Sequence, residues 1–164
     1  KVCLDSDGQL VDKSYYEAVS PAYLCRKGSC IYAVIENADF GGVQVFDVNK
    51  NGSLTAKARL DTEDVYSTYI SAEKRGNRIF VANYGTPSCA VYRYEAEKLV
   101  QESVLREKKT EKSHIHCAAL TPEEAYVCLV DVGTDEILVY AADSLELVDT
   151  VKFPDGRGPR HIVF

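Results

Sequence analysis

The sequence of 164 residues predicts an all-β fold, and three observations support this. Apolar runs of four to eight residues, rich in Val, Ile, Tyr and Phe, alternate with turn-forming segments such as Lys50–Ser53 and Arg75–Asn77. Four such runs form a unit that recurs about every 47 residues. No run shows a sustained helical period. Four short strands repeated at this spacing are typical of a β-propeller blade, and such blades stack radially.

The predicted strands follow the same order in every unit. The first strand recurs at intervals of 44 to 48 residues, at Ala22–Leu24, Thr68–Ile70, His116–Ala118 and Arg160–Ile162. The second strand begins 48 and then 47 residues apart, at Ile31–Glu36, Ile79–Tyr84 and Tyr126–Asp131. The third lies at Val43–Phe46, Ala90–Tyr92 and Ile137–Tyr140. The fourth closes each unit, at Leu54–Leu60, Leu99–Leu105 and Leu145–Val151.

The chain holds about 3.5 such units, whereas closed propellers have about four to eight blades. We expect one partial propeller domain over residues 1–164, whose parts are a blade remnant at 1–21, blades at about 22–66, 67–113 and 114–156, and the start of a further blade at 157–164. The first residue is Lys1, and Phe164 lies inside a predicted strand, so we expect a longer parent protein. An open arc exposes sheet faces, and the remaining chain or a second copy is expected to cover them.

Two other architectures remain open at this stage. An α/β fold requires amphipathic helices between strands, and the one candidate, around Glu95–Lys112, is charge-rich without a continuous apolar face. A β-sandwich or single barrel explains short strands but does not predict the same four-run signature three times. The repeat therefore favours the propeller.

Composition restricts the class of partner. The formal charge of −6 argues against a broad nucleic-acid surface, and no apolar run is long enough to span a membrane. The six cysteines have no metal-ligand spacing, and four of them lie in β-like runs. We interpret the cysteines as core residues of a protein in a reducing compartment and therefore expect a cytoplasmic location. We also expect no nucleic acid or membrane partner and no obligatory cofactor.

All three histidines lie at one register of the repeat, where propeller loops form the usual site. His114 and His116 open the third unit, and on a strand residues i and i+2 point to one face. Arg160 and His161 open the next unit. A guanidinium at the inner rim suits recognition of a carboxylate or phosphate. Two carboxylates at strand ends are also expected to reach the channel, namely Glu36 and Asp131.

Each of these side chains also has a structural interpretation. His114 fits an exposed turn, while His116 and His161 fit hydrogen-bonded packing positions. Arg160 fits a bridge to a carboxylate of a neighbouring blade, and the two carboxylates fit solvated turns. A zinc site needs three or four ligands, and the His-x-His pair supplies two with no third in view, so we expect no metal site.

At these residues the sequence resembles the lactonase family of seven-bladed propellers, which includes bacterial 6-phosphogluconolactonases and a fungal 3-carboxy-cis,cis-muconate lactonising enzyme. The matching segments occur in family order and are Glu36 with Phe40–Phe46, Phe80–Gly85, His114–His116, Val130–Asp135 and Gly158–Phe164. The family chain is about twice as long. Where this sequence has Ile115, the family often has proline.

The resemblance implies a rim site that acts on a lactone. His116 matches the family histidine and Arg160 matches the arginine of the Gly-Pro-Arg-His motif, while the family glutamate would lie beyond Phe164. Lactone hydrolysis needs a base that activates water and positive charge near the developing oxyanion. We assign the first role to His116 and the second, or clamping of a sugar phosphate, to Arg160, with His161 supporting His116.

The expected function is hydrolysis of a sugar lactone, of the 6-phosphogluconolactonase type, with a small-molecule lactone as partner. His114, His161, Glu36 and Asp131 are the expected substrate-binding residues. A lactonising cycloisomerase acting on a dicarboxylic substrate and a propeller that binds without catalysis are the alternatives. Because one catalytic group and half the rim would lie outside it, we expect the 164-residue chain alone to be inactive.

Overall fold

The computed structural model of the chain describes residues 2–105 and 110–164, and every regular element in them is a β-strand. The strands are β1 (Val2–Leu4), β2 (Leu10–Lys13), β3 (Leu24–Lys27), β4 (Cys30–Val34), β5 (Gly41–Val48), β6 (Leu54–Thr62), β7 (Ser67–Ala72), β8 (Arg78–Asn83), β9 (Ser88–Glu95), β10 (Lys98–Leu105), β11 (Ile115–Leu120), β12 (Tyr126–Asp131), β13 (Glu136–Ala141) and β14 (Leu147–Lys152). None of the described residues forms a helix that could cross a membrane.

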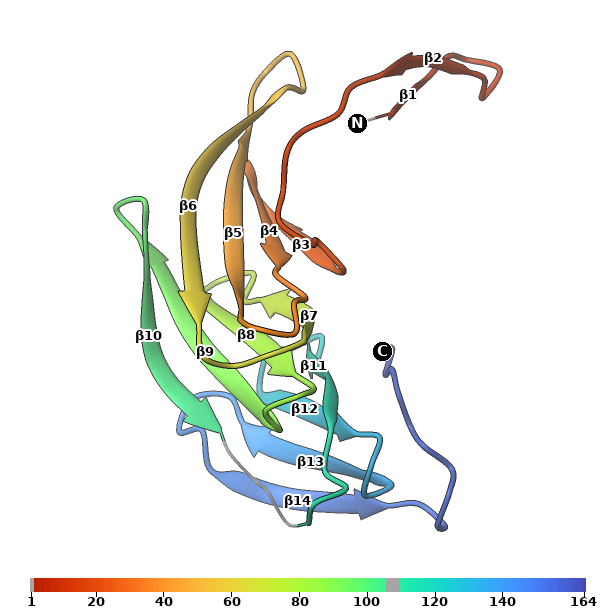
Figure 1. Cartoon of the computed structure of the whole chain (residues 1–164), viewed down its shortest axis with the longest axis vertical. Coiled ribbons are helices and arrows are strands. Elements are labelled where there is room, and N and C mark those ends of the chain that lie inside the picture. Colours follow the sequence, from red (N-terminus) through yellow and green to blue (C-terminus); the bar gives the residue numbers. More distant parts are fainter. Residues whose placement is uncertain (1, 106–109) are drawn as a thin grey trace.

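The strands form three antiparallel four-stranded sheets, each in simple chain order, and one two-stranded sheet. We call the sheets of β3–β6, β7–β10 and β11–β14 the first, second and third blade. Figure 1 shows the blades following one another in an arc, with the first strand of each on the concave side and the last on the convex side. The predicted all-β fold of four-stranded propeller blades is therefore confirmed. Strands β1 and β2 pair with each other only.

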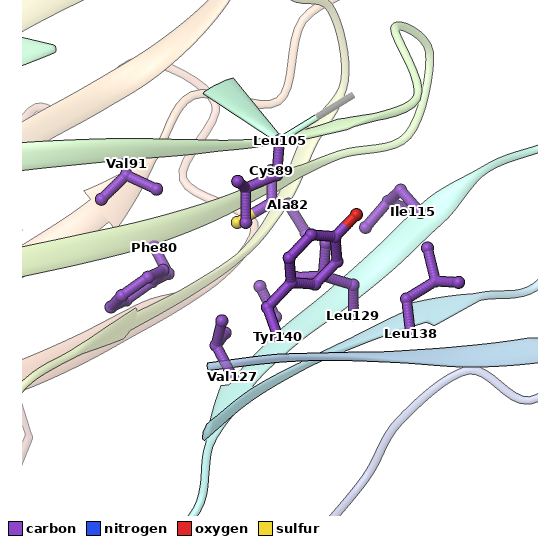
Figure 2. Close-up of a cluster of buried hydrophobic side chains, with 11 residues drawn as sticks. Phe80, Ala82, Cys89, Val91, Leu105, Ile115, Val127, Leu129, Leu138 and Tyr140 are labelled. Carbon is purple, nitrogen blue, oxygen red and sulfur yellow. The ribbon is translucent and has the colours of Figure 1, made fainter. Parts of the chain in front are cut away.

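The hydrophobic core consists of side chains packed between the faces of neighbouring blades. One cluster of buried side chains joins the second and third blades, where Phe80 and Val91 face Leu129 and Tyr140 (Figure 2). A second cluster joins the first and second blades in the same way. Fully burying a residue of this size contributes about 1.5–3 kcal/mol. The strands alternate between the two blade faces, so each blade depends on its neighbours for burial.

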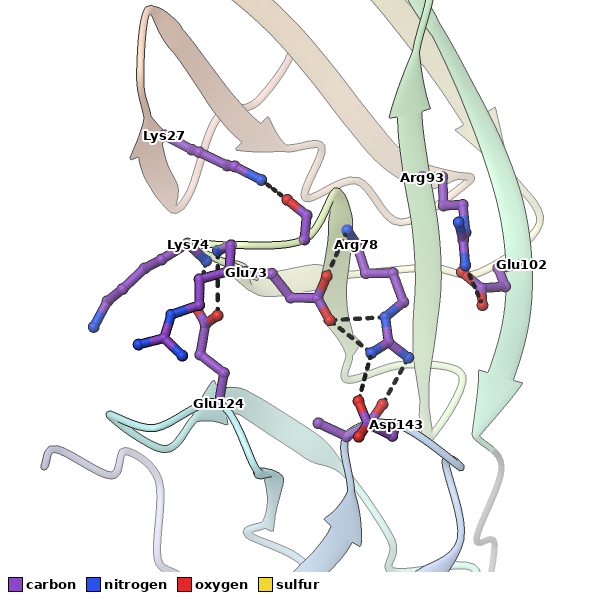
Figure 3. Close-up of polar contacts among 11 residues, drawn as sticks. Lys27, Glu73, Lys74, Arg78, Arg93, Glu102, Glu124 and Asp143 are labelled. Carbon is purple, nitrogen blue, oxygen red and sulfur yellow. Dashed lines mark hydrogen bonds and ion pairs between the residues drawn. The ribbon is translucent and has the colours of Figure 1, made fainter.

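Polar contacts also join the blades, at the turns between their first two strands (Figure 3). Lys27 of the first blade donates to the Gly76 carbonyl of the second. The carboxylate of Glu124 in the third blade accepts the backbone N–H groups of Lys74 and Arg75 in the second. These contacts fix the spacing of the three blades at this rim.

Arg78 makes the most buried of these polar contacts. Its Nη2 lies 2.7 Å from Glu73 Oε1 and its Nη1 donates to the Ala142 carbonyl of the third blade at 2.6 Å. The side chains of Arg78 and Glu73 are only 12% and 9% exposed, so solvent screens this ion pair little.

One predicted strand is not formed by the described residues. Residues Arg160–Phe164 pair with no strand there, although the repeat predicts the first strand of a blade at this place. The first strand of every blade in the structure pairs with the second strand of the same blade, as β11 does with β12. The described residues contain no strand after β14, so no second strand among them supplies the hydrogen bonds that would define a strand at Arg160–Phe164.

We predict that Arg78→Met lowers the free energy of unfolding of the full-length protein by about 3 kcal/mol, because Glu73 is left as a buried, unpaired carboxylate. The double variant Glu73→Met with Arg78→Met should recover most of that loss, since no buried charge remains. Denaturant unfolding followed by circular dichroism measures both. A single variant within about 0.5 kcal/mol of wild type, the spread of ordinary surface substitutions, would show that the buried pair does not stabilise the fold.

Candidate functional site

A cavity of about 300 Å³ lies beside the residues that follow the second strands of the first two blades. Its lining comes from all three blades and from the segment that follows β14, and consists of Glu36, Tyr66, Thr68, Tyr84, His116 and Arg160. Three of the predicted site residues thus meet in one cavity, while His114, Asp131 and His161 are not among its lining residues.

Two β-bulges aim side chains at this cavity. The register of β11 against β12 shifts between Ile115 and Cys117, and that of β7 against β8 shifts between Ser67 and Tyr69. The extra residues are His116 and Thr68, and both line the cavity. A bulge re-aims one side chain without ending the strand, and bulges are frequent beside active sites.

The bulge also corrects the expected geometry of the histidine pair. Ile115 and Ala118 belong to the core cluster on one face of β11, although residues three apart on a regular strand point to opposite faces. His114 precedes the strand and His116 is the inserted residue. The i, i+2 rule therefore does not apply, and the two rings have different surroundings.

His116 is a buried imidazole with little to stabilise its charged form. The residue is 8% exposed, and its Nδ1 has no hydrogen-bond partner among the described residues. Burial, then the charges of Arg160 and His161, lower the pKa of His116 from its ordinary value of 6.5. Because Nδ1 is enclosed, Nε2 is the nitrogen that can face the cavity. His116 is therefore neutral at pH 7 and able to accept a proton.

The ring of His116 is held by aromatic neighbours. Its ring centroid lies 5.9 Å from that of Tyr84 and 5.2 Å from that of His161, both in edge-to-face geometry. The hydroxyl of Thr68 donates to the backbone carbonyl of His116 at 3.1 Å, which ties the second blade to the third at the bulge. An orphaned buried nitrogen costs about 1–3 kcal/mol, so these contacts keep a destabilising group in a fixed position.

Arg160 reaches the cavity from an irregular segment that is anchored on both sides. Before it, the N–H groups of Gly156 and Gly158 donate to the Asp135 carboxylate at 2.8 and 2.6 Å, and these bonds lower the pKa of Asp135. After it, Ile162 packs against the buried side chains of Cys117 and other core residues. The exposed guanidinium is thus carried on a fixed backbone although no strand holds it.

His114 acts on the cavity through Tyr84. The two rings stack with centroids 4.2 Å apart and planes inclined by 7°, and His114 Nδ1 lies 3.0 Å from the Tyr84 carbonyl. The His114 backbone N–H donates to Asp131 at 2.8 Å. His114 thus contacts a lining residue of the cavity and is not itself one of the lining residues.

Asp131 closes a turn instead of facing the cavity. Its carboxylate accepts the Ser113 hydroxyl and the backbone N–H groups of His114, Gly133 and Thr134, and the side chain is buried. Glu36 and Asp131 were expected at the same position of their blades, but the residue of the third blade that corresponds to Glu36 is Val132, one residue later. The N–H groups of Glu36, Tyr84 and Val132 donate to the preceding first-strand segments at 3.0, 2.9 and 3.1 Å, which makes these three the equivalent positions.

Three lining residues were not predicted, namely Thr68, Tyr66 and Tyr84. The repeat contains a signal for two of them. The Tyr84 N–H donates to the Tyr66 carbonyl, as the Glu36 N–H donates to the Ser20 carbonyl, so Tyr84 is equivalent to Glu36 and Tyr66 to Ser20. Within residues 2–105 and 110–164 no group of three or more His, Cys, Asp or Glu is arranged to hold a metal ion. The arrangement offers a neutral base, a cation, a carboxylate and three hydroxyls to a small molecule.

Comparison with curated proteins places the chain among lactonase-like sequences. An uncharacterized protein of Staphylococcus saprophyticus is 31% identical over 165 residues, covering 93% of this chain and 48% of that protein. A 6-phosphogluconolactonase of Bacillus subtilis is 30% identical over 158 residues, covering 88% of this chain and 45% of that protein. The chain spans about half the length of the curated relatives it matches.

Solved structures agree with the architecture. A putative 6-phosphogluconolactonase of Bacteroides fragilis superposes with a TM-score of 0.81 at 27% identity, over 96% of this chain and 51% of that one. A periplasmic gluconolactonase of Pseudomonas aeruginosa has a TM-score of 0.86 at 24% identity, over 98% and 53%, and this likeness concerns the fold alone. A family model described as "Lactonase, 7-bladed beta-propeller" matches residues 4–164. The chain belongs to that family of seven-bladed lactonase propellers.

Proposed function

We propose that the protein hydrolyses the ester bond of a sugar lactone, with His116 as general base and Arg160 as the group that stabilises the oxyanion. The observation that carries the proposal is that a buried, neutral imidazole and an exposed guanidinium line one small cavity. Water activation needs the first, and the negative charge that develops on the carbonyl oxygen needs the second.

The reaction proceeds through proton transfers centred on His116. Its imidazole takes a proton from water as the water oxygen bonds to the lactone carbonyl carbon. The carbonyl oxygen becomes an alkoxide beside Arg160, whose guanidinium donates to it. When the intermediate collapses, the bond between that carbon and the ring oxygen breaks and the imidazolium returns its proton to the ring oxygen. The product is the open hydroxy acid, which ionises at pH 7.

Burial, and after it the charge of Arg160, lower the pKa of His116, and this suits a base that must release its proton again. A guanidinium near the ring disfavours the imidazolium, so the proton is passed on readily to the leaving alkoxide. His161 acts in the same direction from the other side of the ring. The family resemblance adds a glutamate beyond Phe164, and for this reason the full-length protein is the form to assay.

The substrate we assign is 6-phosphogluconolactone or its unphosphorylated analogue, which connects the protein to sugar-acid metabolism and the pentose phosphate pathway. Support comes from the Bacillus subtilis relative named 6-phosphogluconolactonase. We assign the protein to the cytoplasm because Cys25, Cys30, Cys89, Cys117 and Cys128 are free thiols, which fits a reducing compartment.

Replacing His116 by Gln should lower kcat/KM for lactone hydrolysis about 10²–10⁴-fold, because a general base is lost. Replacing Arg160 by Gln should lower it about 10²–10³-fold through loss of oxyanion stabilisation. The assay follows acid release from 6-phosphogluconolactone and glucono-δ-lactone by the full-length protein, after subtraction of spontaneous hydrolysis. Glu63→Gln, an exposed change outside the cavity, is the control. Activity of His116→Gln within a few-fold of the control would exclude His116 as the base.

The pH profile should show the lowered pKa of His116. The base form predominates above that pKa, so kcat/KM should fall only below pH 6.5 as the imidazole becomes protonated. His161→Asn removes one of the charges that disfavour the imidazolium, so the acid limb of its profile should move to higher pH. Initial rates between about pH 5 and 8, the range in which histidine titrates, measure both. An acid limb above pH 6.5 in the wild type would contradict the assignment.

A further inference from the structure

Part of the cavity has no role in the proton transfers. Glu36, Tyr66 and Tyr84 line it together with His116 and Arg160, and they come from the first and second blades. Among the described residues, no hydrogen bond or ion pair occupies the Glu36 carboxylate or the hydroxyls of Tyr66 and Tyr84. Three polar groups that converge on a cavity and are not used by the fold indicate contacts with a ligand.

Tyr66 is held at the cavity in a strained conformation. Its φ is +52°, a left-handed value that costs a tyrosine about 1–3 kcal/mol. Its N–H donates to the Asn37 carbonyl and its carbonyl accepts from the Tyr84 N–H, both at 2.9 Å. Ser20, at the equivalent position of the first blade, also has a left-handed φ of +38°, so the backbone of the blade connection imposes this conformation and thereby fixes Tyr66 at the cavity.

The ring of Tyr66 lies over Gly85, and no larger residue fits below it. A Cβ on Gly85 would come within 2.8 Å of Tyr66 Cδ2 and 2.6 Å of Val65 Cγ2. Tyr66 nevertheless remains 40% exposed, so the close packing against Gly85 positions the ring without burying it. A large, fixed and half-exposed aromatic face beside a cavity is suited to contact with a ring of similar size.

The charge of Glu36 limits which chemical groups can bind beside it in the cavity. An ionised carboxylate only accepts hydrogen bonds, so it binds hydroxyl groups and repels a phosphate or carboxylate placed next to it. Glu36 lies at the position equivalent to Tyr84 by its backbone hydrogen bond; Tyr84 directly follows β8, and Glu36 lies two residues beyond β4. The pair therefore offers one acceptor and one aromatic ring to the same portion of a ligand.

We propose that Glu36, Tyr66 and Tyr84 form a subsite for the uncharged, hydroxyl-bearing carbons of the lactone, and that Tyr66 and Glu36 determine specificity for hydroxylated over plain lactones. This proposal rests on the proposed lactone hydrolysis, and it states that the hydroxyl-bearing part of the substrate faces the first blade. Any phosphate on the substrate binds away from Glu36.

The test compares two lactones in the full-length protein. Glucono-δ-lactone carries the hydroxyls, and δ-valerolactone has the same ring without them. Glu36→Gln and Tyr66→Ala should each lower the ratio of kcat/KM for glucono-δ-lactone to that for δ-valerolactone about tenfold, mainly through KM. Tyr66→Phe, which keeps the ring, should retain most of the ratio. Glu63→Gln and Tyr126→Ala, both exposed and outside the cavity, are the matched controls.

Failure of this proposal is separable from failure of the proposed function. If wild type hydrolyses both lactones and the ratio stays within twofold in Glu36→Gln and Tyr66→Ala, the subsite is wrong and the hydrolase remains. If wild type hydrolyses neither, calorimetric titration with D-gluconate decides. Binding weakened about tenfold by each variant supports the subsite without the reaction, and binding that is absent or unchanged in the variants overturns it.

Discussion

The packing of one blade face against the next is the constraint on which the rest of the structure depends. Each four-stranded sheet exposes apolar side chains on both faces, and the two main core clusters lie between blades. Stacking sheets in this way brings their first strands to one concave side (Figure 1). The cavity lies beside the residues that follow the second strands of the first two blades, and residues more than 120 positions apart, Glu36 and Arg160, line the same space.

Local irregularities turn this meeting point into a chemical site. The bulges at Thr68 and His116 break the strand alternation that would otherwise direct both residues toward a blade face. Asp135 and Ile162 fix the irregular segment that carries Arg160. The buried Nδ1 of His116 has no hydrogen-bond partner among the described residues, and burial, with Arg160 nearby, lowers the pKa of the ring and keeps it neutral. The features that weaken the fold locally are those that prepare the base.

The repeat in the sequence was enough to predict the blades, because period-2 apolar runs and their turns reflect burial that is the same in every unit. It also predicted that His116 and Arg160 would share one register of the repeat and that Glu36, at the end of a second strand, would reach the channel, and all three line the cavity. It could not predict the bulge at His116, which depends on pairing with β12. The one-residue offset between Glu36 and Asp131 likewise follows from hydrogen bonds across strands. The sequence did not indicate Tyr66 and Tyr84 as lining residues, because tyrosines in β-rich sequences usually pack in cores.

The most direct test of the account is a crystal structure of the full-length protein with gluconolactam, an inert analogue of the lactone. The account places the lactam carbonyl within hydrogen-bond distance of Arg160, the His116 Nε2 facing the carbonyl carbon, and the ring hydroxyls on Glu36 beside Tyr66. A ligand bound on the other side of the blades, or His116 and Arg160 directed into separate spaces, would contradict it.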